Sequence, residues 1–303
     1  MDSDPTVTLA DVARAAGVSP MTVSNVLNGV GKGVRRDARE RAAHVRRVAR
    51  QLGYRRNLAA AGTRSGRFGS IALLVSEALG RSTIPSQLLG AVHDALADHG
   101  YHLTLAKLSD EAVTNPDYIP KILQEWSADG LLVNYHKDIP AEMDELIDGC
   151  GHAAVWINCR RMHDCICPDD FDAAQRLTHY LIGQGHLRIA YADFHCDFQH
   201  AATEHYSRYE RWEGYKRAMT NYGYALQRFD FAGRPWKNRA AYEMWSAPAQ
   251  SPLAANDRPT AVIAYSTSDA VPLVLTARGL GLSLPDDLAF ATFDNGPSPT
   301  VYG

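Results

Sequence analysis

At 303 residues, the chain is longer than one ordinary domain and predicts two or three. The composition, with 46% apolar and 21% charged residues and no apolar run of the ~18 residues that cross a bilayer, excludes a membrane-embedded protein. The net charge of −3 is unevenly distributed: residues 1–67 carry 13 Lys and Arg against 5 Asp and Glu, and the rest carry 18 against 29. A small basic segment on a large acidic body indicates a polyanionic partner.

The chain begins with Met-Asp-Ser-Asp-Pro, which is acidic and has no apolar signal region. We therefore expect a cytoplasmic protein and not a secreted one.

Residues 8–28 predict two short helices joined by a tight turn. Thr8, followed by Asp11, has the form of a capping box at a helix start, and Gly17 can adopt the left-handed conformation that ends that helix. Ser19 and Pro20 are typical of the N-cap and first position of the next helix. Apolar residues at helical spacing give each helix one buried face: Leu9, Val12, Ala13 and Ala16, then Val23, Val26 and Leu27. This is the helix-turn-helix arrangement.

In a helix-turn-helix, the N-terminal part of the second helix enters the major groove. The outward side chains of that helix are predicted to be Met21, Thr22, Asn25 and Asn28. Thr22, Ser24 and Asn25 can hydrogen-bond base edges or phosphates, and Met21 or the Thr22 methyl group can contact a thymine methyl group. The alternative interpretation is a small helical module that binds another protein.

The pattern Asp-Val-Ala-x-x-Ala-Gly-Val-Ser-x-x-Thr-Val-Ser-x-Val-Leu-Asn, at residues 11–28, resembles the headpiece of the lactose-repressor (LacI/GalR) family. The resemblance extends from Val7 to Asn28, and Leu52-Gly-Tyr54 ends the headpiece as in that family. It implies a DNA-binding role for Thr8, Ser19, Met21, Thr22, Ser24, Asn25, Asn28, Arg35 and Tyr54.

A third helix is predicted from about Arg36 to Leu52, with Ala42, Val45, Ala49 and Leu52 inward. The outward arginines are candidates for phosphate contacts, which give affinity and salt dependence and not specificity: Arg35, Arg36, Arg39, Arg46 and Arg47. The stretch between Asn28 and Val45 is about one helical turn longer than the family pattern.

Residues 55–68 occupy the linker position. The resemblance implies a short hinge helix that docks in the minor groove and wedges a leucine between base steps. Asn57 and Ala60 match this pattern, and Arg64 and Arg67 can contact phosphates or a narrow groove. Arg56 stands in place of the usual proline, and Thr63, preceded by Gly62, stands in place of the wedge leucine. Gly and Thr form helices less readily, so the helix-turn-helix is expected to bind DNA while the kinking mechanism stays open.

From Gly69 onward, short apolar runs alternate with helical stretches. The predicted strands are Ile71–Val75, His102–Ala106, Gly130–Val133, Ala153–Ile157, Ile189–Ala192, Leu226–Phe229, Ala261–Ala264 and Leu288–Thr292. The predicted helices lie near 85–98, 117–127, 171–184, 208–222, 237–246 and 269–279. This alternation predicts two successive parallel sheets with helices on both faces, and a ligand in the cleft between lobes at the carboxyl ends of the strands.

This part of the chain resembles the periplasmic-binding-protein-like effector domain of the same family. Matching pieces occur in order along the chain, among them Val155-Trp-Ile-Asn-Cys-Arg160, Arg211-Trp-Glu-Gly-Tyr215 and Leu284-Pro-Asp-Asp-Leu-Ala-Phe-Ala-Thr-Phe-Asp294. The predicted fold is therefore an all-α helix-turn-helix headpiece followed by an α/β type I effector domain with two lobes. The expected division is 1–54 for the DNA-binding domain, 55–68 for the hinge, 69–167 for the N-terminal lobe and 168–303 for the C-terminal lobe. Family members continue for several dozen residues beyond the Phe293-Asp-Asn segment, so the second lobe is expected to be incomplete here.

The resemblance also implies effector-binding residues. These are Asp170, Arg211, Trp236, Ser268, Asp269 and Asp294. Arg211 and Asp294 suit sugar hydroxyls because charged groups make the stronger hydrogen bonds, and Trp236 suits the C–H face of a sugar ring. The alternatives are a surface cation for Arg211, a core or surface aromatic for Trp236, and a residue at a helix N-terminus for Asp269.

Five cysteines raise the question of a metal: Cys150, Cys159, Cys165, Cys167 and Cys196. Cys165 and Cys167 lie near His163 and Asp164, but no second ligand pair has zinc-site spacing, so we expect reduced thiols, no metal and no cofactor. The sequence has no nucleophile elbow and no carboxylate pair for hydrolysis, so we do not expect an enzyme.

Together these features predict a homodimeric transcriptional regulator, a repressor, that reads a pseudo-palindromic DNA operator and responds to a sugar-like effector. It would act in the cytoplasm, at the nucleoid, without a membrane partner. Two alternatives stay open: a degenerate regulator that binds DNA without an effector response, and a solute-binding protein.

Overall fold

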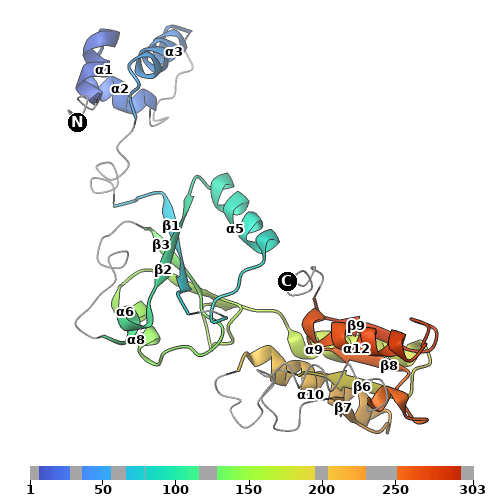
Figure 1. Ribbon diagram of the computed structural model, residues 1–303. Coiled ribbons are helices and arrows are strands. Elements are labelled where there is room, and N and C mark those ends of the chain that lie inside the picture. Colours follow the sequence, from blue (N-terminus) through green and yellow to red (C-terminus); the bar gives the residue numbers. More distant parts are fainter. Residues whose placement is uncertain are drawn as a thin grey trace. The chain divides into compact units, whose positions relative to one another are not determined.

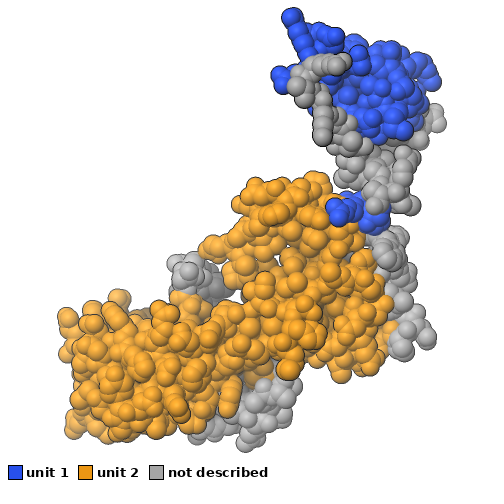
Figure 2. Space-filling model, turned by 180° about the vertical axis from the view of Figure 1, so that it is seen from behind, with its two compact units in different colours: residues 1–68 blue, residues 69–303 orange. Residues whose placement is uncertain are grey.

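A computed structural model describes residues 7–27, 36–55, 66–78, 80–115, 128–194, 204–229 and 251–294. The chain divides into two compact units, residues 1–68 and residues 69–303 (Figures 1 and 2). Each unit has its own core, and each is described separately below.

The first unit, called the headpiece from here on, contains α1 (Leu9–Ala16), α2 (Pro20–Leu27) and α3 (Arg36–Gln51). The local signals in the sequence are confirmed. Thr8 and Asp11 form a complete capping box, and Gly17 ends α1 with φ +64°. The Ser19 hydroxyl accepts a hydrogen bond from the Thr22 backbone N–H (3.2 Å), and Pro20 is the first residue of α2.

The headpiece core draws residues from all three helices. Val12, Val23 and Val45 have no exposed surface. The inward position predicted for Leu52 is wrong: α3 ends at Gln51, and Leu52, in the turn that follows, is 38% exposed. Val48, one helical turn earlier, is buried instead.

The first lobe of the second unit is built on a five-stranded parallel sheet in the order β2-β1-β3-β4-β5. Its strands are β1 (Ser70–Ser76), β2 (His102–Leu108), β3 (Gly130–Asn134), β4 (Ala154–Ile157) and β5 (Cys165–Ile166). Its helices are α5 (Ser86–Asp98), α6 (Asp110–Thr114) and α8 (Glu142–Gly149). Alternate strand residues such as Leu74 and Val133 pack against α6 and α8, and α5 lies on the other side of the sheet (Figure 1).

The second lobe is built on a four-stranded parallel sheet in the order β7-β6-β8-β9. Its strands are β6 (Ile189–Ala192), β7 (Gln227–Phe229), β8 (Ala261–Ala264) and β9 (Ala289–Thr292). Its helices are α9 (Asp170–Gly183), α10 (Tyr206–Asn221), α12 (Thr267–Gly279) and a 3-10 turn, η3 (Pro252–Ala254).

The two central strands of this sheet, β6 and β8, are buried along their whole length. Ile189 and Tyr191 pack with α9 and α10, whereas Ala190 and Ala192 pack with α12. Successive residues of a strand face opposite sides of its sheet, so this division is what a strand covered by helices on both faces requires.

Each predicted strand of the body is present in the structure, with shifts of one or two residues at some ends. The predicted helices near 85–98, 171–184, 208–222 and 269–279 correspond to α5, α9, α10 and α12. The strand β5 and the helices α6 and α8 were not predicted from the sequence. The helices predicted at 117–127 and 237–246 lie outside the described residues.

Within the described part of the chain, no helix combines the length and the apolar character needed to cross a bilayer.

Gly214 of α10 provides a test of how closely the second lobe is packed. A Cβ at this position would lie 2.3 Å from the Phe171 carbonyl oxygen and 2.9 Å from the Ala174 Cβ of α9. A backbone carbonyl can move away only if the whole helix shifts. We therefore expect Gly214→Ala to lower the free energy of unfolding by about 2–3 kcal/mol, measured from the midpoint of urea unfolding with an unchanged dependence on urea concentration.

Gly183, the last residue of α9, is the matched control, because a Cβ there meets nothing within 4 Å. Gly183→Ala should leave stability unchanged or raise it by up to about 1 kcal/mol, since alanine loses less backbone entropy in a helix. Equal stabilities of the two variants would contradict the close approach of α9 and α10.

Candidate functional site

The exposed side of α2 is the candidate reading surface. Met21 is 69% exposed and Asn25 is also exposed, whereas Thr22 and Ser24 are half-buried. The Ser19 and Thr22 hydroxyls lie 2.9 Å apart and hydrogen-bond each other, which fixes the Thr22 side chain at the start of the helix. Hydroxyl, amide and thioether groups are therefore presented together on one side of α2.

Two other predicted DNA contacts have structural partners. The Thr8 hydroxyl donates to Asp11 Oδ2 (2.6 Å), and the Asp11 carboxylate also accepts from the Thr8 backbone N–H (3.0 Å). These hydrogen bonds lower the pKa of Asp11. Tyr54 packs against the headpiece core and lines a hollow of about 450 Å³ with Leu27 and Ala49. Asn28, Arg35, Asn57, Ala60, Thr63 and Arg64 lie outside the described residues.

The predicted effector residues that the structure describes lie at the carboxyl edge of the second sheet. Arg211 Nε donates to Asp170 Oδ1 at 2.6 Å, and Arg211 Nη1 donates to the Tyr265 carbonyl at 2.9 Å. The Arg211 guanidinium also lies over the Tyr265 ring (4.7 Å) and the Phe293 ring (4.5 Å). The structure thus brings Arg211 and Asp170 together, with side chains only 15% and 4% exposed.

Asp269 occupies the helix N-terminal position that the sequence left as an alternative. It has no exposed surface: one carboxylate oxygen accepts from the Phe194 backbone N–H (2.9 Å), and the other accepts from the Ser266 hydroxyl, the N-cap of α12. These hydrogen bonds hold the start of α12, and an effector contact by Asp269 stays a prediction. Ser268, beside it, is half-buried. Asp294 is exposed and accepts from the Thr267 backbone N–H at 2.9 Å, and Trp236 lies outside the described residues.

The start of α10 contacts the ends of β3 and β4 across the two lobes. His205 Nε2 donates to the Asn158 carbonyl at 3.0 Å, and the Tyr206 hydroxyl donates to Asn158 Oδ1 at 3.2 Å. Arg160 pairs with Glu210 at 2.6 Å. None of these residues was assigned a role from the sequence, although Asn158 and Arg160 lie in a quoted matching piece. Asn158 and Arg160 follow a predicted strand, and His205 and Tyr206 precede a predicted helix.

Arg208 is a second buried guanidinium near Arg211. It pairs with Asp193 and with Glu204 (3.0 Å) and lies 4.3 Å over the Tyr265 ring. Burial alone would lower the pKa of Arg208, but the two carboxylates raise it, so the group stays charged. Each of the three arginines here, Arg160, Arg208 and Arg211, has a carboxylate partner.

Two histidines, one from each lobe, meet at the same place. The His136 and His205 rings are 5.1 Å apart in an edge-on arrangement. Burial, with the nearby His205 and Lys137, lowers the pKa of His136 to about 4, and burial also lowers the pKa of His205. The Thr83 backbone N–H donates to His136 Nε2 at 2.7 Å, which requires this nitrogen to be unprotonated. Both rings are therefore neutral at pH 7.

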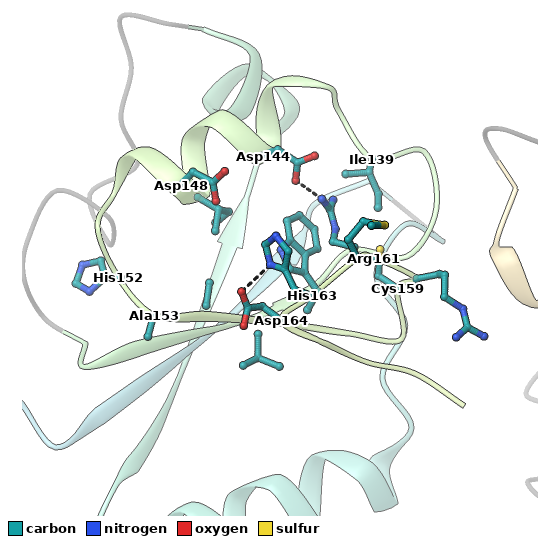
Figure 3. Close-up of a pocket in the computed structure, with 15 residues that line it drawn as sticks. Ile139, Asp144, Asp148, His152, Ala153, Cys159, Arg161, His163 and Asp164 are labelled. Atoms are coloured by element: carbon teal, nitrogen blue, oxygen red, sulfur yellow. Dashed lines mark hydrogen bonds and ion pairs between the residues drawn. The ribbon is translucent and has the colours of Figure 1, made fainter. Parts of the chain in front are cut away.

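A separate hollow of about 850 Å³ lies in the first lobe, between α8 and the loop that joins β4 to β5 (Figure 3). Ile147, Trp156 and Cys159 supply apolar walls, and Arg161 lies 3.6 Å over the Trp156 ring while pairing with Asp144. The hollow contains no predicted effector residue.

Cys150, Cys159, Cys165 and Cys167 are free thiols, and no group of His, Cys, Asp or Glu side chains in the described ranges could hold a metal ion. Cys196 is not among the described residues. Burial raises the pKa of Cys159 and of Cys167, so both stay protonated at neutral pH.

Comparison with protein families gives two matches. Residues 8–57 match the model described as bacterial regulatory proteins, lacI family. Residues 178–302 match the model of a periplasmic binding protein-like domain. The first match contains the headpiece helices, and the second contains Arg211 and the carboxyl edge of the second sheet.

Curated relatives and solved structures agree with these matches. The HTH-type transcriptional repressor PurR of Vibrio vulnificus is 29% identical over 296 residues, which is 95% of this chain and 82% of the relative. PurR of Pectobacterium atrosepticum is 26% identical over 294 residues, covering 95% and 80%. The lac repressor dimer bound to operator and the anti-inducer ONPF is similar in structure, with a TM-score of 0.67 and 20% identity over 98% of this chain and 84% of that one.

A complex described as transcriptional regulator CelR with cellobiose has a TM-score of 0.53 and 24% identity over 96% of this chain and 83% of that one. At such identities the solved structures show the shared fold.

Proposed function

We propose that the chain is a transcriptional repressor of the lacI family of bacterial regulatory proteins and that it binds a specific DNA operator through α2. The observation that carries the proposal is the outward side of a capped α2, where Met21 and Asn25 are exposed while Val23 is buried on the opposite side. A short helix held rigidly in this way can enter the major groove with its side chains already placed.

We assign base reading to Met21, Thr22, Ser24 and Asn25. The Asn25 amide can bond two groups of one adenine, and the apolar ends of Met21 and Thr22 suit a thymine methyl group. Asn28, Arg35, Asn57, Ala60 and Arg64 are assigned to the same DNA partner from the sequence alone. Ser19 and Thr8 act at the starts of α2 and α1, from which their hydroxyls can also reach phosphates.

The functional unit is a homodimer, so that two headpieces read the two halves of a pseudo-palindromic site. The helix α5 has no buried residue, and Leu88, Leu89 and Leu105 of the α5 and β2 region are 38%, 37% and 65% exposed. We assign this apolar surface to a second copy of the chain, because a similar structure is described as a dimer on its operator.

The effector is assigned to the carboxyl edge of the second sheet, near Arg211 and Asp170, where the first lobe contacts α10. The guanidiniums of Arg160, Arg208 and Arg211 are all paired with carboxylates. A charged ligand would have to break one of these pairs, and for the nearly buried Arg208 and Arg211 this would leave a charge without its partner, which is costly. A neutral, polyhydroxylated ligand such as a sugar can hydrogen-bond to them without separating any pair.

The DNA-binding assignment is tested by selecting bound duplexes from a random-sequence pool with the full chain. We expect a pseudo-palindromic site, and we expect Asn25→Ala to lower the ratio of specific to random binding by roughly 5- to 150-fold, the equivalent of about 1–3 kcal/mol. Gln51→Ala, at the exposed end of α3, is the matched control and should leave the ratio unchanged. A wild-type chain that enriches no sequence would refute the assignment.

The effector assignment is tested by calorimetry with cellobiose and other neutral sugars, and with gluconate and sugar phosphates as charged analogues. We expect a neutral sugar to bind and the charged analogues to fail. Arg211→Lys should weaken binding at least tenfold because lysine lacks the planar fork that bonds Asp170 and Tyr265 together, whereas Arg176→Lys, on the exposed side of α9, should not. Preferential binding of the charged analogues would contradict the argument from paired charges.

Failure of the whole sugar panel, with operator binding intact, would favour the alternative of a regulator without an effector response. A solute-binding role is disfavoured because such a protein has no use for the capped helix-turn-helix of the headpiece. We further propose that the protein is not an enzyme and that it works in the cytoplasm at the nucleoid, as DNA binding requires.

A further inference from the structure

The outer side of α3 carries a row of arginines. At 3.6 residues per turn, five arginines fall within about 100° of the helix circumference, and at 1.5 Å per residue the row is about 21 Å long. We call this row the arginine stripe; its members are Arg36, Arg39, Arg46, Arg47 and Arg50, and all are exposed. Val45, Val48 and Ala49 are buried on the opposite side of the helix.

Repulsion between neighbouring arginines of the stripe destabilises α3. Arg46 and Arg50 are four residues apart, and Arg36 and Arg39 and also Arg47 and Arg50 are three apart, so like charges are neighbours along it. Only Asp37 and Glu40 supply negative charge within α3, and Glu40 pairs with Arg36 at 3.0 Å. Such self-repulsion is relieved by a partner with closely spaced negative charges.

The stripe and the reading surface belong to different sides of the headpiece. The helices α1, α2 and α3 contact one another pairwise and share one core, to which they contribute Val12, Val23 and Val45. The outward sides of three helices around one core point in three different directions. A duplex with α2 in its major groove therefore does not extend along the whole stripe of α3.

We propose that the arginine stripe binds the phosphate backbone of a second DNA duplex, so that one headpiece holds two duplexes at once. A DNA strand carries one phosphate per 3.4 Å of axis but winds around that axis, so a straight stripe of about 21 Å faces only about three of the roughly six phosphates in that length. Arg46 and Arg50 also border the hollow of about 450 Å³ beside Tyr54. The inference rests on the proposed DNA-binding function and adds to it a bridging activity.

The test uses the full chain and two 30-base-pair duplexes of defined mixed sequence, one immobilised and one fluorescent. The variant Arg46→Gln, Arg47→Gln, Arg50→Gln removes three charges while keeping good helix formers on the exposed side of α3. The matched control, Arg176→Gln, Arg217→Gln, Arg278→Gln, removes three exposed charges from the second unit. Circular dichroism verifies that each protein is folded.

We expect the stripe variant to capture the fluorescent duplex at least tenfold less well than the wild type and the control. The slope of log capture against log salt should fall by about 3, since each lost phosphate contact contributes about 0.9. The ratio of specific to random binding of a single duplex should keep its wild-type value, because that ratio depends on base contacts and not on phosphate contacts.

Three results would overturn the proposal. If the slope for a single duplex falls by about 3, the stripe contacts the same duplex that α2 reads. If neither slope changes, the stripe is a solvated surface. If the variant captures the second duplex more tightly than the wild type does, the arginine stripe binds the acidic second unit, residues 69–303, and not DNA. The bridging test uses duplexes of no specific base sequence. A chain that selects no operator from a random pool but still captures the second duplex would therefore refute the proposed function and leave the bridging activity standing.

Discussion

The burial of Val23 in the headpiece core fixes which side of α2 is left for a partner. Val23 is the only residue of α2 that is fully buried, and it packs with Val12 of α1 and Val45 of α3. An eight-residue helix does not hold its shape alone in water, so its orientation must come from this tertiary contact. With Val23 inward, the Met21 and Asn25 side chains are exposed, and the capped start of α2 can enter the major groove of DNA.

The second unit shows the same principle at a larger scale. Alternate residues of β6 and β8 are buried against helices on both faces of the sheet, so the sheet edges are the places where polar groups gather. At the carboxyl edge, Arg211, Arg208 and their carboxylates form ion pairs that are nearly excluded from water. Buried pairs of this kind contribute little net stability, but removal of one partner is costly, so they are better suited to specificity.

The features that were predictable from the sequence depend on neighbours in the chain. The Thr8–Asp11 capping box, the left-handed Gly17 and the Ser19-Pro20 start of α2 each need no more than four residues, and the structure confirms them. Strands β6 and β8 were predicted to the residue because each is a short apolar run between turn residues.

The features that the sequence analysis missed depend on contacts between distant residues. The strand β5 has two residues and is defined by backbone pairing with Trp156 and Ile157, so it leaves no apolar run. The pairing of Arg208 with Asp193 and the contact of His205 with Asn158 join different elements, and only the fold brings them together. Leu52 was misplaced because the helical period was extended one residue beyond the end of α3. The Met143 and Ile147 spacing of α8 was a readable helix signal that was overlooked.

The central claim is that α2 lies in the major groove with its exposed side on the bases. The most direct measurement replaces Met21 by a photo-crosslinking amino acid in the full chain and maps the cross-links on the selected operator. Because Met21 is 69% exposed on the reading side, we predict cross-links to bases in the major groove, at one position in each half-site. Cross-links confined to sugars and phosphates, or spread evenly along the duplex, would contradict the account.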